Sequence, residues 1–309
     1  GGVVDADLNN DSYNNEIAIG LTNDGLRWYY SNGTLMDNYD PNNDGFYSIT
    51  ACDLNNDTIP EIIGGTSEGD IFVANVNGTE MWNYSSETGD IVELECADIN
   101  EDGINDILAI ESGDQLHVLF GQNGSVMWST VDIDARTLGI VDLNNDGIKN
   151  EILVGRGTNR LFAYNSSGVE DFLWEIESTY FPGGGSLRDI AIQDLDGDGF
   201  YDDFAITAPG EDIYVFSGDM TGYVEMWNYS FTSSNRADYL IASDINNDGN
   251  INVIGGTRDG FARVFDSNGE IIFEFETQDR IGDSLSHGSG RALDTSDINN
   301  DGINEIAVA

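Results

Sequence analysis

Short apolar, β-branched runs recur along the chain, and each begins at an acidic residue. Five of these runs are Glu16–Gly20, Glu61–Gly65, Asp106–Ile110, Glu151–Gly155 and Glu305–Ala309. They are too short for helices and have the composition of buried strands. A polar turn and a further apolar strand follow most of them, as at Asp70–Ala74. An Asn-Gly type hairpin turn then leads to a strand with an aromatic residue, such as Trp82.

This pattern repeats with a period of 44 to 53 residues. Each unit predicts four antiparallel strands, which is the make-up of a propeller blade. We therefore expect an all-β fold, a single seven-bladed β-propeller of four-stranded antiparallel blades over residues 1–309. The expected blades span about 1–40, 46–86, 90–131, 136–178, 187–232, 237–277 and 290–309. The last blade is expected to be incomplete in this chain, with two of its four strands.

An acidic phrase joins the first strand of each unit to the second. It reads Asp-x-Asn/Asp-x-Asp and begins at Asp7, Asp53, Asp98, Asp142, Asp194, Asp244 and Asp297. This pattern suits a hard cation and favours Ca²⁺ over Mg²⁺. It offers oxygen-bearing side chains at positions 1, 3 and 5, a carbonyl at position 7 and a carboxylate at position 9 or 10. The last carboxylate comes earlier than position 12 of an EF-hand. Each phrase therefore predicts a calcium loop between two strands.

We number these loops 1 to 7 in chain order and expect up to seven structural Ca²⁺ ions. Their candidate ligands are Asp7, Asn9, Asp11, Tyr13 and Glu16; Asp53, Asn55, Asp57, Ile59 and Glu61; Asp98, Asn100, Asp102, Ile104 and Asp106; Asp142, Asn144, Asp146, Ile148 and Glu151; Asp194, Asp196, Asp198, Phe200 and either Asp202 or Asp203; Asp244, Asn246, Asp248, Asn250 and Asn252; and Asp297, Asn299, Asp301, Ile303 and Glu305. The alternative, that the phrases are only solvated turns, does not explain seven copies in register.

Three loops depart from the pattern. Asn252 replaces the closing acid in loop 6, and Ser12 and Thr58 replace the glycine at position 6 in loops 1 and 2. Glycine relieves backbone strain at that position, and a carboxylate binds Ca²⁺ better than an amide. We therefore expect loops 1, 2 and 6 to bind calcium more weakly than the others.

The phrase resembles the FG-GAP and VCBS repeats of integrin alpha-chain heads and of microbial surface proteins. Residues 194–210 are the most similar copy, since they carry the metal loop, the strand and an Ala-Pro-Gly ending together. The resemblance implies a calcium-binding propeller at the cell surface or outside the cell. Because the family includes adhesins, lectins and some polysaccharide lyases, it favours adhesion or recognition of a protein or glycan and leaves the partner open.

Composition limits the cellular compartment and the classes of partner that fit this chain. The formal net charge of −46 argues against nucleic acid or an anionic membrane as a partner, and no apolar run is long enough to span a bilayer. Candidate glycosylation acceptors are Asn32, Asn77, Asn83, Asn123, Asn165 and Asn228, with two more, Asn10 and Asn56, inside calcium loops. They favour an extracellular glycoprotein, although Asn-Gly is also simply a good hairpin turn.

Cys52 and Cys96 lie one and two residues before the first Asp of loops 2 and 3. Strand alternation then points their side chains to opposite faces. The sequence therefore predicts two free buried thiols rather than a disulfide.

Arginine is concentrated in the turns opposite the calcium loops. Eight of the ten arginines fall there: Arg136, Arg156, Arg160, Arg188, Arg236, Arg258, Arg280 and Arg291. We expect Arg136, Arg188, Arg236 and Arg291 to contact the partner; the alternative is local pairing with acids such as Asp134, Asp189, Asp238 and Asp259. The long segment Thr277–Arg291 lies in this group of turns. Residues Asp40–Ser48 repeat the metal phrase there and are a weaker candidate for an eighth ion.

We expect a binding protein rather than an enzyme. The alternative is a polysaccharide lyase or hydrolase that uses Glu93 and Glu95, with Asp189 and Asp294 on other first strands. A third alternative is an architectural component of a cell-surface layer or filament. His117 and His287 have no spacing that predicts a triad or a transition-metal site. Blade packing explains the fourth-strand aromatics, such as Trp82, without a bound organic cofactor.

Overall fold

The computed structural model describes residues 2–21, 24–40, 45–86, 89–112, 115–131, 133–168, 172–181, 185–208, 212–231, 237–276, 293–296 and 304–308. These residues form strands and turns, and none of them lies in a helix. None therefore forms a helix that would be long and apolar enough to cross a membrane. The chain divides into two compact units, one holding the described residues up to Ala135 and the other those from Arg136 onward.

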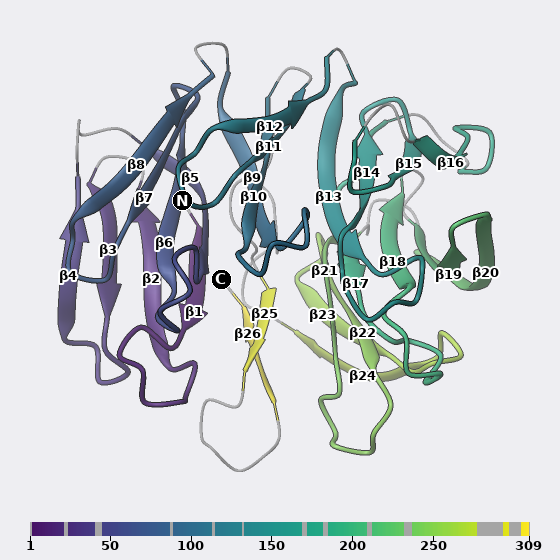
Figure 1. The fold of residues 1–309 in the computed structure, drawn as a ribbon. Coiled ribbons are helices and arrows are strands. Elements are labelled where there is room, and N and C mark those ends of the chain that lie inside the picture. Colours follow the sequence, from purple (N-terminus) through teal and green to yellow (C-terminus); the bar gives the residue numbers. More distant parts are fainter. Residues whose placement is uncertain are drawn as a thin grey trace. The chain divides into compact units, whose positions relative to one another are not determined.

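The first unit consists of three four-stranded sheets that follow one another in sequence (Figure 1). The first sheet is β1 (Val3–Ala6), β2 (Glu16–Leu21), β3 (Gly25–Tyr29) and β4 (Leu35–Tyr39). The second is β5 (Phe46–Cys52), β6 (Glu61–Thr66), β7 (Asp70–Ala74) and β8 (Glu80–Ser85). The third is β9 (Ile91–Ala97), β10 (Asp106–Glu111), β11 (Gln115–Leu119) and β12 (Val126–Ser129). In each sheet, neighbours in sequence pair antiparallel.

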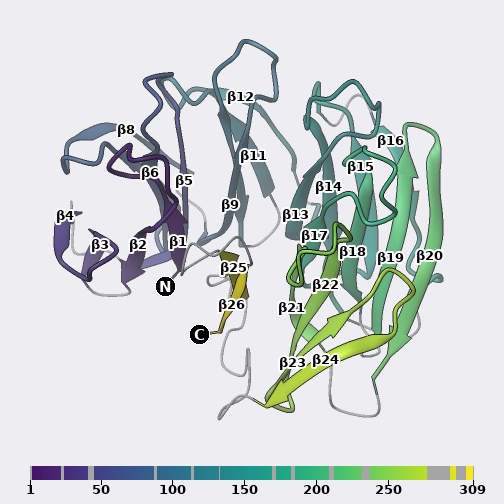
Figure 2. The same cartoon turned by 90° about the horizontal axis from the view of Figure 1, so that it is seen from below.

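The second unit repeats this plan (Figure 2). Its sheets are β13 (Ala135–Val141), β14 (Glu151–Arg156), β15 (Arg160–Tyr164) and β16 (Phe172–Ile176); β17 (Ile190–Ile192), β18 (Asp203–Ala208), β19 (Asp212–Asp219) and β20 (Gly222–Ser230); and β21 (Ala237–Ser243), β22 (Asn252–Thr257), β23 (Phe261–Phe265) and β24 (Ile271–Glu276). β25 (Leu293–Ser296) and β26 (Glu305–Val308) form a two-stranded sheet. The predicted unit of four strands is therefore confirmed, as are the two strands predicted for the seventh unit.

Each sheet packs face to face on the next within its unit. One core cluster joins the first two sheets through Trp28, Phe46 and Phe72, and another joins the fourth and fifth through Trp174 and Phe204. The second strands β6, β10, β18 and β22 are buried along their whole length. This burial explains why the runs after the acidic phrases are apolar at every position.

In the second and fourth sheets, a fourth-strand tryptophan joins its sheet to the hairpin of the next one. The indole Nε1 of Trp82 donates to the Gly121 carbonyl at 2.8 Å, and that of Trp174 donates to the Asp219 carbonyl at 2.7 Å. A Cβ added to Gly124 would lie 2.4 Å from the Trp82 ring, so that turn needs glycine. Packing therefore accounts for these aromatic residues, as expected from the sequence.

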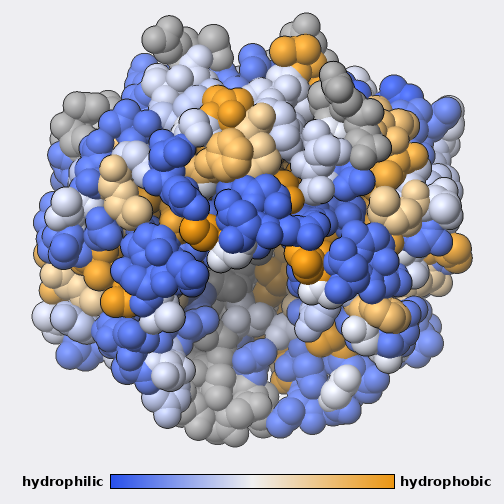
Figure 3. All heavy atoms as spheres, viewed as in Figure 1, coloured by the Kyte–Doolittle hydropathy of each residue, from blue (hydrophilic) through white to orange (hydrophobic). Residues whose placement is uncertain are grey.

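Charge and polarity dominate the surface. On the face seen in Figure 3, hydrophilic residues predominate and apolar residues occur in small scattered groups. This distribution agrees with the net charge of −46.

Candidate metal centres

Loops 1 to 6 share one backbone geometry, which the position-1 Asp holds in place. In loop 1, the two carboxylate oxygens of Asp7 accept from the backbone N–H groups of Asp11 at 2.9 Å and Ser12 at 2.7 Å. The same pair of hydrogen bonds, 2.8 to 3.2 Å long, occurs in loops 2 to 6. The sequence repeat is therefore also a structural repeat.

A second contact fixes the next part of each loop. The position-5 Asp accepts from the backbone N–H of position 7 in all six loops, at 2.8 to 3.0 Å. Oxygen-bearing side chains at positions 1 and 5 are thus held by the same turn.

The residue at position 6 has a positive φ in all six loops. Gly103, Gly147, Gly199 and Gly249 adopt φ values of 86 to 96°. Ser12 and Thr58 take φ of 75° at the same position, which is unfavourable for side chains with a Cβ and most of all for β-branched threonine. The reason given for expecting weaker loops 1 and 2 is therefore correct, while the calcium affinities themselves remain a prediction.

The closing acids lie at the first residue of the second strand and are buried. Glu16, Glu61, Asp106, Glu151 and Asp203 are each at most 2% exposed. Four of the five accept from the backbone N–H of position 2 in the same loop, for example Glu61 from Leu54 at 2.9 Å. In loop 5 it is Asp203, which begins β18, that takes this place, while the neighbouring Asp202 is also buried.

Burial makes these carboxylates hard to ionise. It raises the pKa of Glu61 and Asp203 to about 7 and that of Asp106 to about 6, and nearby loop acids push in the same direction. The pKa values of Glu16 and Glu151 are also raised, chiefly by burial. A buried carboxylate among other acids is stable as an anion only with a cation or a compensating set of donors.

Loops 1 and 5 bring three carboxylates together. Oxygens of Asp7, Asp11 and Glu16 lie within 4.8 Å of one another, as do those of Asp194, Asp196 and Asp203. In each group one buried oxygen, Glu16 Oε2 or Asp203 Oδ1, accepts no hydrogen bond from the described residues. An all-oxygen donor set with an unsatisfied buried carboxylate oxygen fits a hard divalent cation such as Ca²⁺.

Asparagine side chains contact the closing acids of loops 1, 2 and 4. Asn9, Asn55 and Asn144, each at position 3, donate through Nδ2 to the closing acid of their own loop, at 2.8, 2.7 and 3.1 Å. In loop 6, Asn252 is buried and its Oδ1 accepts no hydrogen bond from the described residues, so a neutral oxygen stands where the acid is in the other loops. In loop 7 only Glu305, at the start of β26, lies within the described part of the chain; Asp297, Asn299, Asp301 and Ile303 lie outside it.

Neighbouring loops also contact one another within a unit. Asn105 Nδ2 donates to the Asp53 carbonyl at 3.0 Å, which ties loop 3 to loop 2. The backbone N–H of Asp142 donates to the Tyr201 carbonyl at 3.1 Å, and Lys149 Nζ lies 3.8 Å from the centre of the Tyr201 ring. Repeat spacing does not predict these contacts, because they depend on how successive sheets pack.

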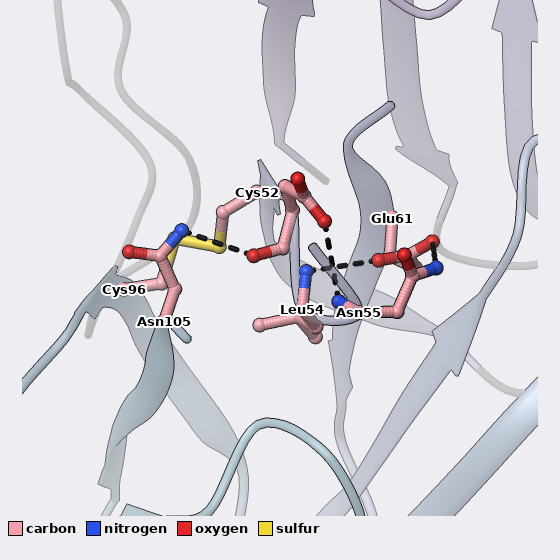
Figure 4. The surroundings of a disulfide bond; sticks show 7 residues. Cys52, Leu54, Asn55, Glu61, Cys96 and Asn105 are labelled. Carbon is pink, nitrogen blue, oxygen red and sulfur yellow. Dashed lines mark hydrogen bonds between the residues drawn. A yellow bond between two sulfur atoms is a disulfide. The ribbon is translucent and has the colours of Figure 1, made fainter. Parts of the chain in front are cut away.

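Cys52 and Cys96 form a disulfide, so the prediction of two free buried thiols is wrong (Figure 4). Their Cα atoms are 6.7 Å apart, and both residues are only partly buried. Strand alternation does point them to opposite faces, but they lie on the first strands of two different sheets, β5 and β9, that pack side by side. Where one sheet stacks on the next, a face of the first sheet meets the opposite face of the second. Cys52 and Cys96 lie on these two facing surfaces, so their side chains point toward each other.

Several of the described arginines pair with local acids. Arg258 and Arg188 contact opposite oxygens of Asp238 at 2.6 and 3.4 Å, and Arg263 contacts Asp259 at 2.6 Å. Local pairing was the alternative left open by the sequence, and a role in partner contact remains a prediction. Arg236, Arg280 and Arg291 lie outside the described residues, as do the whole Thr277–Arg291 segment and residues 41–44 of the candidate eighth loop.

The candidate catalytic carboxylates are divided between the two units. Glu93 and Glu95 lie on β9, partly exposed and alternating with buried Leu94. Asp189 belongs to the second unit, where its carboxylate accepts from the backbone N–H groups of Ile190 at 3.0 Å and Leu240 at 2.7 Å. Asp189 thus supports the backbone, and the side chain of Asp294 lies outside the described residues.

Sequence reasoning missed a polar chain around His117. Its Nε2 lies 2.9 Å from Glu111 Oε2, and its Nδ1 lies 2.9 Å from Ser129 Oγ and 3.3 Å from the Tyr84 hydroxyl. The partners come from β10, β12 and β8, so no linear spacing reveals them. Because Glu111 and His117 are buried in the sheet interface, the arrangement indicates a structural role.

The candidate glycosylation acceptors lie in two kinds of position, hairpin turns and fourth strands. Asn32, Asn77 and Asn123 are exposed in hairpin turns, where each Oδ1 accepts the backbone N–H two residues later at 2.8 to 3.0 Å. Asn83 and Asn228, on fourth strands, donate through Nδ2 to Glu80 and Glu225, both at 2.7 Å. Asn165 lies at the corresponding turn of the fourth sheet. Their modification remains a prediction.

Comparisons with known proteins support the fold. No family model matches the chain, and no curated protein sequence matches it. A computationally designed protein, Ika8, superposes with a TM-score of 0.66 at 12% identity, over 99% of this chain and 82% of its own. The β-propeller domain of Cps50 (Swd1) from Myceliophteria thermophila gives a TM-score of 0.66 at 9% identity, over 91% of this chain and 89% of its own.

Identities this low show the fold alone. The six four-stranded antiparallel sheets and the likeness to a solved propeller agree with the pattern of the sequence. The protein has an all-β propeller fold of six to seven blades.

Proposed function

We propose that this protein is a calcium-stabilised propeller, secreted or held at the cell surface, that recognises a protein or glycan partner. The proposal of calcium binding rests on two buried carboxylate oxygens, Glu16 Oε2 and Asp203 Oδ1, which accept no hydrogen bond from the described residues. Each belongs to a group of three acids. In loop 5, the candidate ligands Asp194, Asp196, Asp198 and Asp203 would hold the ion. Bound Ca²⁺ would supply positive charge and act structurally.

Mutual repulsion explains why the ions would stabilise the fold. Each loop gathers several carboxylates, and the chain as a whole carries a formal charge of −46. A cation that binds only the folded state stabilises it in proportion to the logarithm of its concentration. With the weak affinities typical of extracellular modules, stability would depend on roughly millimolar Ca²⁺.

Three features support a place outside the cell. Millimolar calcium is found there, disulfides such as Cys52–Cys96 persist in oxidising compartments, and the exposed Asn32, Asn77 and Asn123 turns are accessible for glycosylation. We infer recognition rather than catalysis; of the candidate carboxylates, Asp189 accepts from two backbone N–H groups and so supports the fold.

The partner would bind at the turns opposite the calcium loops, in or beside which Arg188 and Arg136, at the start of β13, lie in the described part of the chain. A recognition surface with arginine is typical of protein and glycan contacts. Arg188 shares Asp238 with Arg258, so it is held in a fixed orientation. Fixing a side chain before binding reduces the entropy lost on association.

Calcium dependence is tested with Glu16→Gln and Asp203→Asn, each of which removes the charge of a buried closing acid. Both variants should lose part of the calcium-induced rise in melting temperature, because each removes one ligand charge. Exposed Glu68, outside the loops, provides the matched control as Glu68→Gln and should behave like the unchanged protein. Equal calcium responses in all four proteins would contradict the proposed metal centres.

Recognition is tested by screening the calcium-loaded protein against glycan and polysaccharide arrays and extracellular protein libraries, with Arg136→Ala and Arg188→Ala as variants. Loss of a signal in variants that keep the parent melting temperature would assign the binding surface. Breakdown of a bound polysaccharide that Glu93→Gln or Glu95→Gln abolishes would overturn the proposal in favour of an enzyme.

A further inference from the structure

The disulfide lies at the start of two neighbouring candidate calcium loops. Cys52 is the last residue of β5 and directly precedes Asp53, the first ligand of loop 2. Cys96 lies near the end of β9, two residues before Asp98, the first ligand of loop 3. Both cysteines are partly exposed, so a small reductant can reach them.

A hydrogen-bonded path connects the disulfide to both closing acids (Figure 4). Asn105, the residue before the closing acid Asp106 of loop 3, donates to the Asp53 carbonyl at 3.0 Å. Within loop 2, Glu61 accepts from Leu54 N at 2.9 Å and from Asn55 Nδ2 at 2.7 Å. The disulfide therefore joins the starts of the two loops, and the Asn105 amide joins the end of loop 3 to the start of loop 2.

Electrostatic repulsion between loops 2 and 3 gives the disulfide that joins them a function. Loops 2 and 3 together carry seven acids: Asp53, Asp57, Glu61, Asp98, Glu101, Asp102 and Asp106. Without cations, these like charges drive the two loops apart, and a covalent tether between the loops opposes that separation. Holding ligands near their bound positions reduces the ordering that ion binding requires. The chain has only two cysteines, so no other loop has such a tether.

We propose that the Cys52–Cys96 disulfide controls calcium binding by loops 2 and 3, so that the oxidised protein binds Ca²⁺ at these loops more tightly than the reduced one. This inference rests on the proposed calcium function. Reduction by a dithiol transfers two electrons and two protons: the protein disulfide becomes two thiols, and the dithiol becomes a disulfide. By linkage, calcium at these loops must make the disulfide harder to reduce by the same factor.

The first test measures calcium binding by calorimetric titration in the oxidised protein and in the Cys52→Ser/Cys96→Ser double variant. Two sites should weaken by about tenfold in the variant, within the range of ordinary coupling between sites, while the remaining sites keep their affinity. Identical titrations would overturn the inference. If the oxidised protein bound no calcium at millimolar concentration, the proposed calcium function would fail instead, so the two failures are distinguishable.

The reciprocal test keeps the cysteines and does not depend on the double variant folding. The disulfide is equilibrated with a dithiol redox buffer at a constant millimolar Ca²⁺ concentration. Asp57→Asn/Asp102→Asn, which weakens loops 2 and 3, should make the disulfide up to about a hundredfold easier to reduce, because the two tenfold couplings multiply. The matched control Asp11→Asn/Asp198→Asn, which weakens loops 1 and 5, should leave it unchanged.

The Asn105 link is tested in the oxidised protein with Asn105→Ala. A smaller loss of affinity than in the cysteine variant, confined to two sites, is expected because the covalent tether remains. Equal ease of reduction in the two Asp→Asn double variants would overturn the proposal, since it would show that loops 2 and 3 have no special connection to the disulfide.

Discussion

Loop 2 and loop 5 reach the same backbone turn by different means. Loop 5 carries Asp196 at position 3 and glycine at positions 4 and 6, and three of its carboxylates lie within 4.8 Å of one another. Loop 2 has Asn55 at position 3 and a strained Thr58 at position 6, but a disulfide and the Asn105 amide fasten its first strand to the next sheet. Ligand charge supports one loop, and a tether supports the other.

The two loops share a buried closing acid whose pKa is raised to about 7, Glu61 in loop 2 and Asp203 in loop 5. This common feature means that each loop opposes folding in the absence of a cation at neutral pH. The comparison indicates that the need for a cation resides in the closing acid, while the affinity for it depends on the remaining ligands and on how firmly the loop is held.

The largest expected effect is a pH dependence that reverses with calcium. The folded-state pKa values of Glu61, Asp203 and Asp106 exceed those of the unfolded chain, so the folded state without calcium binds more protons. In chelator, stability should therefore be greatest below about pH 4 and fall as pH rises through 6 to 7, by several kcal/mol in sum. Denaturant titration in chelator at pH 5 and pH 8 measures this difference.

With saturating calcium the sign should be opposite, because protons compete with the ion for the same carboxylates. Stability should then decrease as the pH is lowered from 8 to 5. The same pH trend with and without calcium would contradict the assignment of the closing acids as ligands.

A sign reversal is also expected on neutralising one closing acid. In millimolar calcium, Asp203→Asn should destabilise the protein by about 1 to 2 kcal/mol, the contribution of an ion at roughly two- to twentyfold its dissociation constant. In chelator the same change should stabilise it, because a buried carboxylate that resists ionisation becomes a neutral amide. Urea unfolding in both buffers measures the two values.

Glu61→Gln provides the comparison in loop 2. Its loss in calcium should be smaller than that of Asp203→Asn, since the strained Thr58 already weakens the loop. A larger loss at Glu61 would show that the tether outweighs ligand charge, and would reverse the order assigned to the two loops.

The smallest effect concerns the strain in loop 2. Thr58→Gly should stabilise the calcium-bound protein by about 1 kcal/mol, because glycine adopts the φ of 75° without a Cβ clash. Thr58→Ala keeps the strain and serves as the control in thermal unfolding. A Thr58→Gly protein no more stable than Thr58→Ala would show that the backbone is not strained there.

The sequence predicts features that depend on one strand or one loop. Glu61 and Asp106 were expected to begin buried strands and do so, because an acid that ends a turn and opens an apolar run has a local signature. The positive φ at position 6 was expected for the same reason, since glycine occurs there in most copies.

Features that depend on contacts between sheets could not be predicted. The Cys52–Cys96 disulfide was missed because alternation gives the face of a residue within its own sheet and not which faces of two sheets meet. The contact between His117 and Tyr84 arises in the same way, from strands of two different sheets. Repeat periodicity gives the unit, and packing decides the side-chain partners.

The most direct test of the account is the melting temperature of the oxidised protein at pH 7.5 in 2 mM Ca²⁺ and in excess chelator, at about 0.15 M ionic strength so that general charge screening is equal. The account predicts a melting temperature in chelator that is lower by about 10 °C or more, with restoration when calcium is added back. An unchanged melting temperature would contradict the claim that cations at the acidic loops stabilise this fold.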